Sequence, residues 1–324
     1  MRRGRRLGVV LLAAAVIGEL FGGGSVTTAL LTDQEAVAVT FTTAASFPDI
    51  TPPAVGASVI SKSTPYVPGF IRRGGTYHVY ANVTDAGSGV ALVSANVSTV
   101  TTGQSAVPLV AGAFTIGGVA YGYRSAAIIA NAVLAAGAKS YSITATDVAT
   151  NSATQGGFSV TVDNTRPTGA AISTANGGSI VGRPELGDSV TFTFSEEIDP
   201  HSVLAGWNGA ATAVVVRIAN AAGGDRLTIR NAANTAQLPL GPVNLGGTGY
   251  LSATRNFGAT GTASTMLMSG ASITITFGTP SGATTTQAGT TTMAWTPSTT
   301  ATDRAGNRCL NTVVTESLPA DVEF

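Results

Sequence analysis

The sequence predicts an all-β protein with two tandem β-sandwich domains, and three observations support this. Only 10% of the 324 residues are charged, and much of the polar remainder is threonine, a β-branched residue that packs well on a sheet. Forty glycines supply the many turns that such a fold needs. Short segments of alternating polar and apolar residues recur along the chain, a pattern typical of strands with one buried face.

The first domain is expected over residues 51–165. It starts at a proline-containing segment, Thr51–Pro53, and a similar segment, Asn164–Pro167, follows about 115 residues later. The apolar members of its clearest alternations are Tyr77, Val79, Ala81 and Val83, then Tyr141, Ile143 and Ala145, and finally Phe158, Val160 and Val162. Several such strands separated by turns predict a sandwich of two aligned sheets. The segment Ser125–Ala136 has a helical composition, but we expect a short crossover turn there.

The second domain, residues 166–324, repeats this pattern. Its alternating apolar residues are Val190, Phe192 and Phe194, then Val214, Val216 and Ile218, then Leu227 and Ile229, and finally Ile273, Ile275 and Phe277. Between Asn231 and Met266 the pattern is weaker and rich in Gly, Ala and Thr. We interpret this stretch as strands joined by extended loops.

The N-terminus predicts export. Residues 1–29 are interpreted as a signal peptide, and residues 30–50 as a segment that links it to the first domain. Basic residues in Met1–Arg6 precede a 12-residue apolar run, Leu7–Gly18, which is too short to span a membrane comfortably. Small residues around Ala29 offer a cleavage site. A mature chain without a stable membrane anchor, secreted or held at the cell surface, is therefore expected.

The segment Gly18–Ala44, GELFGGGSVTTALLTDQEAVAVTFTTA, resembles the leader of proteins exported through the SipW-type signal peptidase. That group contains the TasA and camelysin biofilm-matrix proteins. The resemblance implies an envelope or matrix destination. The rest of the chain does not resemble the fibre domain of those proteins.

Three later motifs resemble the turns of bacterial immunoglobulin-like repeats in surface proteins. They are Val83–Val90 (VTDAGSGV), Ala145–Asp147 with Asn151, and Thr302–Asn307 (TDRAGN). The segment Thr193–Asp199 (TFSEEID) resembles a strand element of a related immunoglobulin-like class. The resemblance implies two tandem immunoglobulin-like domains, a fold that hosts many unrelated functions.

Composition excludes several classes of function. The net charge is zero and no basic stripe is interleaved with aromatic residues, so no nucleic-acid partner is expected. A single cysteine, Cys309, allows neither an intramolecular disulfide nor a cysteine zinc site, and we expect it to be a small buried residue in a strand.

No catalytic site is assigned. Glu196, Glu197 and Asp199 form an acidic cluster, but adjacent residues of a strand point to opposite faces, so the two glutamates should not converge on one substrate. The only histidines are His78 and His201, and no Gly-x-Ser-x-Gly segment accompanies either.

Calcium at Asp85, Asp147 and Asp163 stays open, because these turn residues could gather at one end of a sandwich. No dense calcium-binding loop is present, so we interpret them as turn formers and assign no metal or cofactor. Trp207 and Trp295 could stack on sugars, although core positions are the preferred interpretation.

These observations predict a non-enzymatic, structural or adhesive protein of the cell surface or extracellular matrix. Its expected partner is an envelope or matrix component, either polysaccharide or protein. One alternative is a carbohydrate-binding or carbohydrate-active protein. Another is a fibre subunit that self-associates through Ala36–Phe47 as a donor strand. Because Glu316–Phe324 has no apolar tail, retention at the surface is expected to be non-covalent.

Overall fold

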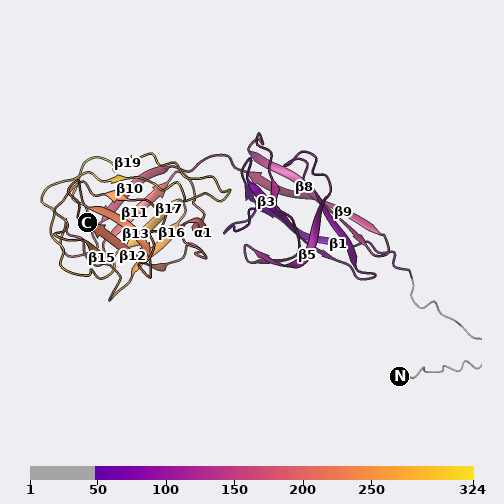
Figure 1. Ribbon diagram of the computed structural model, residues 1–324, viewed down its shortest axis with the longest axis horizontal. Helices are drawn as coiled ribbons and strands as arrows, with labels where there is room; N and C mark the ends of the chain where they lie inside the picture. The colour runs from indigo at the N-terminus through magenta and orange to yellow at the C-terminus, as the bar shows by residue number, and fades with distance from the viewer. Residues whose placement is uncertain (1–47) are drawn as a thin grey trace, which may run out of the picture. The chain divides into compact units, whose positions relative to one another are not determined.

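The computed structural model describes residues 48–324, which form two separate β-sheets, each with a hydrophobic core of its own (Figure 1). The first sheet runs from Ala54 to Val162 and the second from Gly169 to Thr315. The all-β expectation is therefore confirmed. The sequence predicted two aligned sheets in each domain, but the strands of each domain hydrogen-bond into one continuous sheet. The expected boundary after Thr165 lies between the last strand of the first sheet and the first strand of the second. The expected signal peptide, residues 1–29, and the candidate donor segment Ala36–Phe47 lie outside the described residues.

The first domain contains nine strands. They are β1 (Ala54–Ser61), β2 (Phe70–Ile71), β3 (Thr76–Thr84), β4 (Val90–Asn96), β5 (Val107–Ile116), β6 (Val119–Ser125), β7 (Ile128–Ile129), β8 (Gly137–Asp147) and β9 (Ser152–Val162). Their order is β1-β3-β6-β5-β4-β8-β9-β2, with β7 beside β3. All pairs are antiparallel except β2 and β9, which are parallel.

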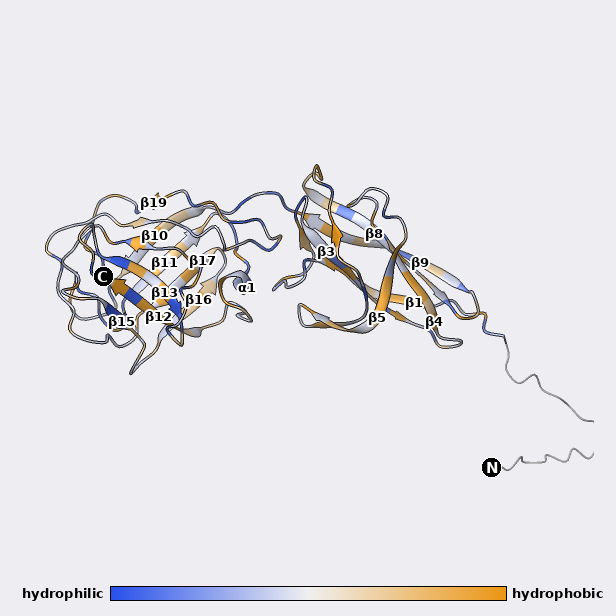
Figure 2. Ribbon diagram, viewed as in Figure 1, coloured by the Kyte–Doolittle hydropathy of each residue, from blue (hydrophilic) through white to orange (hydrophobic). Residues whose placement is uncertain are grey.

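The alternation predicted for the first domain is confirmed. Tyr77, Val79, Ala81 and Val83 of β3 all point into the core, as do Tyr141, Ile143 and Ala145 of β8. Intervening residues such as Asn82 and Thr144 are partly exposed. Tyr80 is an exception: the alternation placed it on the polar face of β3, but it is buried in a second cluster with Ile116 and Tyr121. Figure 2 shows hydrophobic and polar residues mixed along the strands in this way. The segment Ser125–Ala136 contains the short strand β7 and turns, and no helix.

The second domain contains ten strands and one short helix. They are β10 (Gly169–Ala175), β11 (Ser189–Phe194), α1 (Pro200–Val203), β12 (Thr212–Ala219), β13 (Arg226–Asn231), β14 (Val243–Asn244), β15 (Arg255–Phe257), β16 (Ser264–Ser269), β17 (Ser272–Thr276), β18 (Ala294–Trp295) and β19 (Val314–Thr315). The order is β10-β11-β17-β16-β12-β13-β14-β18-β19, with β15 beside β12.

Both tryptophans lie in the core of the second domain. Trp295 is fully buried between Phe192 and Phe194, with ring centroids 5.3 and 5.0 Å away, and its Nε1 donates to the Leu240 carbonyl at 2.7 Å. Trp207 is 5% exposed and its Nε1 donates to the Ala210 carbonyl at 2.6 Å. A sugar-stacking platform needs an exposed ring face, so the preferred interpretation as core residues is confirmed.

Helix α1 is an element that the alternation did not predict. Asp199 caps it by accepting the His201 N–H at 2.9 Å, and Pro200 stands in the first turn, where its missing N–H costs nothing. The stretch between Asn231 and Met266 consists of short strands and loops, as expected. In residues 48–324, no helix has the length and apolarity needed to cross a bilayer.

Candidate functional site

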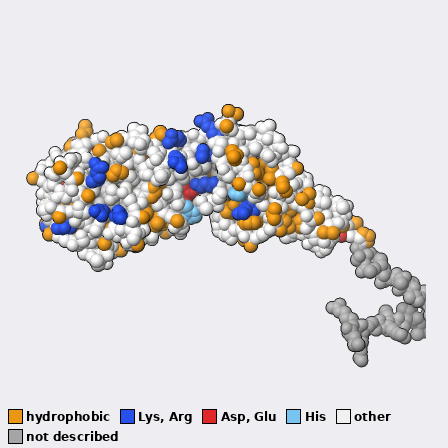
Figure 3. All heavy atoms as spheres, viewed as in Figure 1, with side chains coloured by type: hydrophobic (Ala, Val, Ile, Leu, Met, Phe, Trp, Pro, Cys, Tyr) orange, Lys and Arg blue, Asp and Glu red, His pale blue; other side chains and the backbone are white. Residues whose placement is uncertain are grey.

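Three groups of carboxylates come together in the described part of the chain. In each, one oxygen from every residue lies within 4.8 Å of the others. The groups are Asp49, Asp85 and Asp147; Asp163, Glu196 and Asp303; and Glu316, Asp321 and Glu323. They stand out because charged side chains are sparse on the surface in Figure 3.

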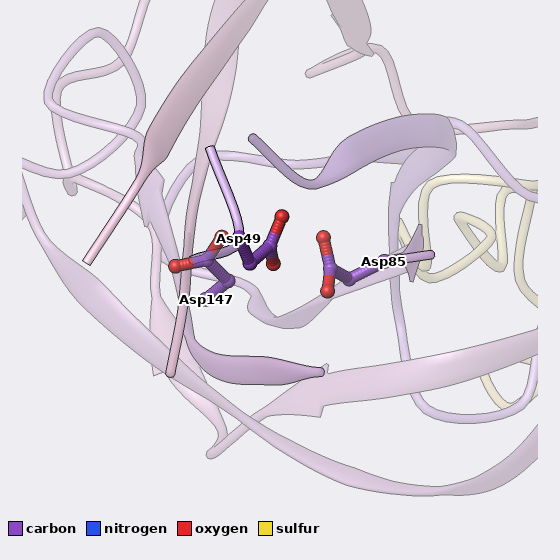
Figure 4. A group of neighbouring side chains, drawn as sticks. All are labelled: Asp49, Asp85 and Asp147. Atoms are coloured by element: carbon purple, nitrogen blue, oxygen red, sulfur yellow. The ribbon is translucent and has the colours of Figure 1, made fainter. Parts of the chain in front are cut away.

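The first group joins three distant parts of the first domain. Asp49 precedes β1, Asp85 directly follows β3, and Asp147 is the last residue of β8. Figure 4 shows the Asp85 carboxylate facing that of Asp49, with Asp147 beside Asp49. Asp147 is 1% exposed, so its charge is almost completely removed from water.

Asn151 links Asp49 and Asp147 of the first group through hydrogen bonds. Its Nδ2 donates to the Asp49 carbonyl at 3.0 Å and to Asp147 Oδ2 at 2.8 Å, while its backbone N–H donates to Asp147 Oδ1 at 2.7 Å. The turn between β8 and β9 therefore holds the segment that enters the domain.

Backbone N–H groups also bind these carboxylates. Asp85 Oδ2 accepts from Gly87 and Gly89 at 3.1 and 2.7 Å, so the interpretation of this aspartate as a turn former agrees with the geometry. Asp49 accepts from Ser88 and Thr51 at 2.7 and 3.0 Å, and these bonds lower its pKa. Asp85 Oδ1 is enclosed and has no hydrogen-bond partner.

The second group repeats this arrangement in the second domain. Asp163 lies between β9 and β10, Glu196 follows β11, and Asp303 occupies the turn that precedes Asn307. Asn307 Nδ2 donates to the Asp163 carbonyl at 2.9 Å and to Asp303 Oδ2 at 2.8 Å, and its backbone N–H donates to Asp303 Oδ1 at 2.8 Å. These bonds match those of Asn151 one by one.

Burial makes the second group electrostatically unfavourable. Burial, and then the charges of Asp163 and Asp303, raise the pKa of Glu196 to about 7. Burial also raises the pKa of Asp303, which is 1% exposed. Glu196 Oε1 is enclosed and has no hydrogen-bond partner. The three carboxylates line a cavity of about 200 Å³ together with Phe70, Glu197 and Arg304.

The third group is of a different kind. Glu323 is fully buried, and both its oxygens accept hydroxyl hydrogen bonds, Oε2 from Thr174 at 2.8 Å and Oε1 from Thr291 at 3.4 Å. Burial and the neighbouring Glu316 raise the pKa of Glu323 to about 8. A proton on Glu323 therefore relieves the repulsion in this group.

The structure corrects the expected grouping of the aspartates. Asp85 and Asp147 do meet, but Asp163 belongs to the second group, because it follows the last strand of the first sheet and starts the segment leading into the next domain. The third member of the group with Asp85 and Asp147 is Asp49, where Asp163 was expected. Both residues start a D-x-T-x-P motif, Asp49–Pro53 and Asp163–Pro167, and this repeat is the sequence signal that would have identified Asp49.

The acidic residues considered for catalysis have different partners. Glu196 joins the second group and Glu197 forms an ion pair with Arg304. Both glutamates nevertheless line the same cavity of about 200 Å³, contrary to the expectation that they would not converge. Neither His78 nor His201 belongs to a carboxylate group in residues 48–324. His78 Nδ1 lies 3.0 Å from the Ser125 carbonyl.

Cys309 is fully buried, as expected, although it lies in an irregular segment and not in a strand. Burial raises the pKa of its thiol to about 11, which disfavours the reactive thiolate. Comparison with protein-family models and with curated proteins finds no match to this chain.

Proposed function

We propose that this chain is an exported, non-enzymatic protein of the cell surface or extracellular matrix, built from two immunoglobulin-like sandwich domains. One observation carries the proposal. In each domain, the asparagine of a T-D-x-x-x-N turn donates one hydrogen bond to the segment that precedes the first strand and two to the aspartate of its own turn. A feature repeated in tandem domains suits a structural module, whereas an active site normally occurs once.

The strand arrangement supports the immunoglobulin-like part of the proposal. In the first domain the short strand β2 pairs parallel with the last strand β9, and every other pair is antiparallel. Inward-facing residues alternate along the strands around a large core in each domain, a pattern that sandwich domains share. The expected signal peptide, residues 1–29, supplies the argument for export.

A carbohydrate-active protein is the second candidate, because the cavity at Asp163, Glu196 and Asp303 does collect carboxylates. Glycoside hydrolysis needs two carboxyl groups on either side of the scissile bond, about 5–10 Å apart. Here three lie closer together, and the same arrangement recurs in the first domain. The repetition favours a structural role for both groups.

The proposed location and partner are tested in cells that produce the full-length chain. We expect the protein in the medium or on the cell surface, with an N-terminus at or close to Leu30. Mature protein should be retained by purified envelope or matrix polymers in a pulldown. A full-length cytoplasmic product that starts at Met1 would contradict the proposal, and glycan hydrolysis that E196Q abolishes would favour the second candidate.

The role of the segment after the leader needs a separate experiment. We expect Ala36–Phe47 to stay with its own molecule, because sheet edges are usually protected from pairing with other chains. Mature protein with and without residues 30–48 should therefore stay monomeric in light scattering and electron microscopy. Filaments that disappear on deletion would instead establish a fibre subunit that assembles by donor-strand exchange.

A further inference from the structure

A cavity of about 980 Å³ lies at the junction of the two domains. Its walls are the loop between β1 and β2 (residues 63–68), the turn between β5 and β6 (residues 115–118), and residues of the second domain between His201 and Asn208. It shares no lining residue with the three carboxylate groups of the described residues. Its volume is within the range of sites that hold small ligands, about 300–1,000 Å³.

A largely buried ion pair fixes the walls of this cavity relative to one another. Lys62 Nζ of the first domain lies 2.6 Å from Asp199 Oδ2 of the second, and the two side chains are 18% and 2% exposed. Lys62 also donates to the Asp303 carbonyl at 3.2 Å. Asp199 Oδ1 accepts the His201 N–H at 2.9 Å, so one carboxylate holds both the junction and a residue of the cavity. A site that is formed before its ligand arrives loses less entropy on binding.

Tyr66 brings an exposed aromatic ring to the cavity. It is 38% exposed, whereas every other Phe, Tyr and Trp in residues 48–324 is buried or half-buried. Pro65 and Pro68 stand on either side of Tyr66 and restrict the backbone of its loop. The β5–β6 turn packs tightly on this loop, because a Cβ at Gly117 would overlap Pro68. His201 contacts the Tyr66 ring edge-on, with ring centroids 5.6 Å apart. The ring is therefore held in a defined position.

The rest of the lining is polar and uncharged. Among the described residues that form it there is no Asp, Glu, Lys or Arg. Asn208 Oδ1 accepts the Ala210 N–H at 3.0 Å, which leaves the two hydrogens of its Nδ2 for a ligand. Besides this amide, the lining includes the imidazole of His201 and the hydroxyl groups of Ser63, Thr64 and Thr115.

These properties select the class of ligand. A charged ligand would lose its hydration without gaining a counter-charge, and a purely apolar ligand would leave the hydroxyl and amide groups of the wall unpaired. A sugar ring has an apolar face of C–H groups, which stacks on an aromatic ring. It also has a rim of hydroxyl groups, which exchange hydrogen bonds with neutral polar side chains. The lining thus matches an uncharged sugar.

A peptide fits this wall less well. A peptide that binds by strand addition needs a long open strand edge. Of the described residues in this wall, only Thr115 and Ile116 belong to a strand, and they are the last two residues of β5. The other lining residues come from loops, a turn and helix α1.

We propose that this cavity binds an uncharged glycan, one sugar ring of which stacks on Tyr66 while His201 and Asn208 form hydrogen bonds with its hydroxyl groups. This rests on the proposed function, because it gives the expected envelope or matrix polysaccharide a place to bind. Tyr66 and Asn208 also line a second cavity of about 310 Å³, whose charged residues Glu197 and Arg304 are paired with each other. A glycan of several units can therefore extend past Tyr66 from one cavity into the next.

Isothermal titration calorimetry of the full chain with cellohexaose, maltohexaose and chitohexaose tests the class of ligand. We expect at least one of these neutral hexasaccharides to bind with a dissociation constant of about 0.1–1 mM, because one stacked ring and a few neutral hydrogen bonds give a modest affinity. Decaproline, a peptide of the kind that docks in aromatic-lined grooves, should not bind. An absence of binding by all three sugars would overturn the proposal, and binding of decaproline in their place would assign the cavity to proline-rich peptides.

Substitutions in the cavity assign the binding to this site. Tyr66→Ala should weaken hexasaccharide binding about tenfold through loss of the stacked ring, whereas Tyr66→Phe keeps the ring and should weaken it only about threefold. Asn208→Asp keeps the acceptor for the Ala210 N–H but replaces the two amide hydrogens with a charge. It should also weaken binding about tenfold.

Leu92→Ala is the control for these variants, because Leu92 is an exposed residue of the first domain that does not line the cavity. It should leave the affinity unchanged. Melting temperatures show whether each variant folds. An unchanged affinity in Tyr66→Ala, or in Asn208→Asp if Tyr66→Ala does not fold, would overturn the proposal.

The pulldown against envelope or matrix polymers separates this proposal from the proposed function. If the polymers retain Tyr66→Ala as strongly as the original chain, the proposed function stands and the glycan site at Tyr66 is wrong. If they retain neither chain although a hexasaccharide binds at Tyr66, the glycan site stands and the proposed partner is wrong.

Discussion

Glu323 is a buried carboxyl group whose environment disfavours its charge. Its pKa of about 8 in the folded protein lies above the ordinary value of 4.5, so the folded state holds this proton more tightly than the unfolded chain does. The stabilisation from Glu323 is thus complete below about pH 4.5. It is lost as the pH rises toward 8.

This titration predicts a pH-dependent stability of the second domain. Between pH 5 and 8 the Glu323 proton should by itself decrease the free energy of unfolding by about 1 kcal/mol per pH unit, and Glu196, whose pKa is raised to about 7, should add to the decrease below that pH. In Glu323→Gln the decrease should become shallower and only the Glu196 part should remain, which urea denaturation at several pH values will measure. Glu185→Gln is the control: backbone hydrogen bonds from Ser179 lower the pKa of Glu185, so its removal should leave this slope unchanged. An equal slope in E323Q and the original chain would refute the assignment.

The burial of single residues was predicted correctly where the side chain has a strong preference for the core. Two tryptophans in a chain with a large core belong in that core, and a lone cysteine is usually buried. The carboxylate groups were harder to predict, because residues from separate loops meet only through the fold. Asp49 and Asp85 are brought together by the pairing of β1 with β3, which no local pattern reveals.

At the scale of elements, alternation predicted the long strands well and the short ones poorly. Strands β3, β8 and β11 alternate over six or more residues, and the apolar alternation identified their core residues except Tyr80, while the buried Asp147 was interpreted as a turn residue. Strands β14, β18 and β19 have two residues each, too few for any periodic signal. The loops around them are still ordered by buried residues such as Leu240 and Tyr250.

A glycine is required where β15 approaches β16. Gly258 has φ +81°, and a Cβ there would meet the backbone of Ser264. Gly258→Ala should therefore destabilise the second domain by more than about 2 kcal/mol, from strain and overlap combined. Thermal denaturation will measure this loss.

Gly223 provides the matched control for this substitution. Its φ is not in the left-handed region and no atom lies within 4 Å of the position of a Cβ. Gly223→Ala should change the free energy of unfolding by less than about 0.5 kcal/mol. Similar losses of stability in the two variants would show that the close approach to Ser264 is not the reason for a glycine at position 258.

At the scale of the whole molecule, each domain has a separate core. The first core includes Tyr77 and Ile143, and the second includes Trp295 and Ile275. The sequence predicted two domains because its pattern of proline-containing segments and alternating strands occurs twice. It did not predict how each domain holds the segment that enters it, because those hydrogen bonds connect residues more than 100 positions apart.

Separate cores predict separate unfolding transitions. Ile143→Val and Ile275→Val are a matched pair, since both isoleucines are fully buried in the middle of a strand. Each should cost about 1 kcal/mol and shift only the transition of its own domain in scanning calorimetry. If either substitution moved both transitions equally, the two domains would have to unfold as one unit.

The hydrogen bonds of Asn151 and Asn307 have a mechanical consequence. Asn151 and Asn307 each connect the peptide that leads into a domain to a turn 102 or 144 residues further along the chain. Tension applied along the backbone would reach these amide hydrogen bonds before it reaches the first strand behind them. The two connections stand in series and carry the same tension, so a molecule stretched between two attachments would open the weaker connection first and then meet a second resistance of the same kind.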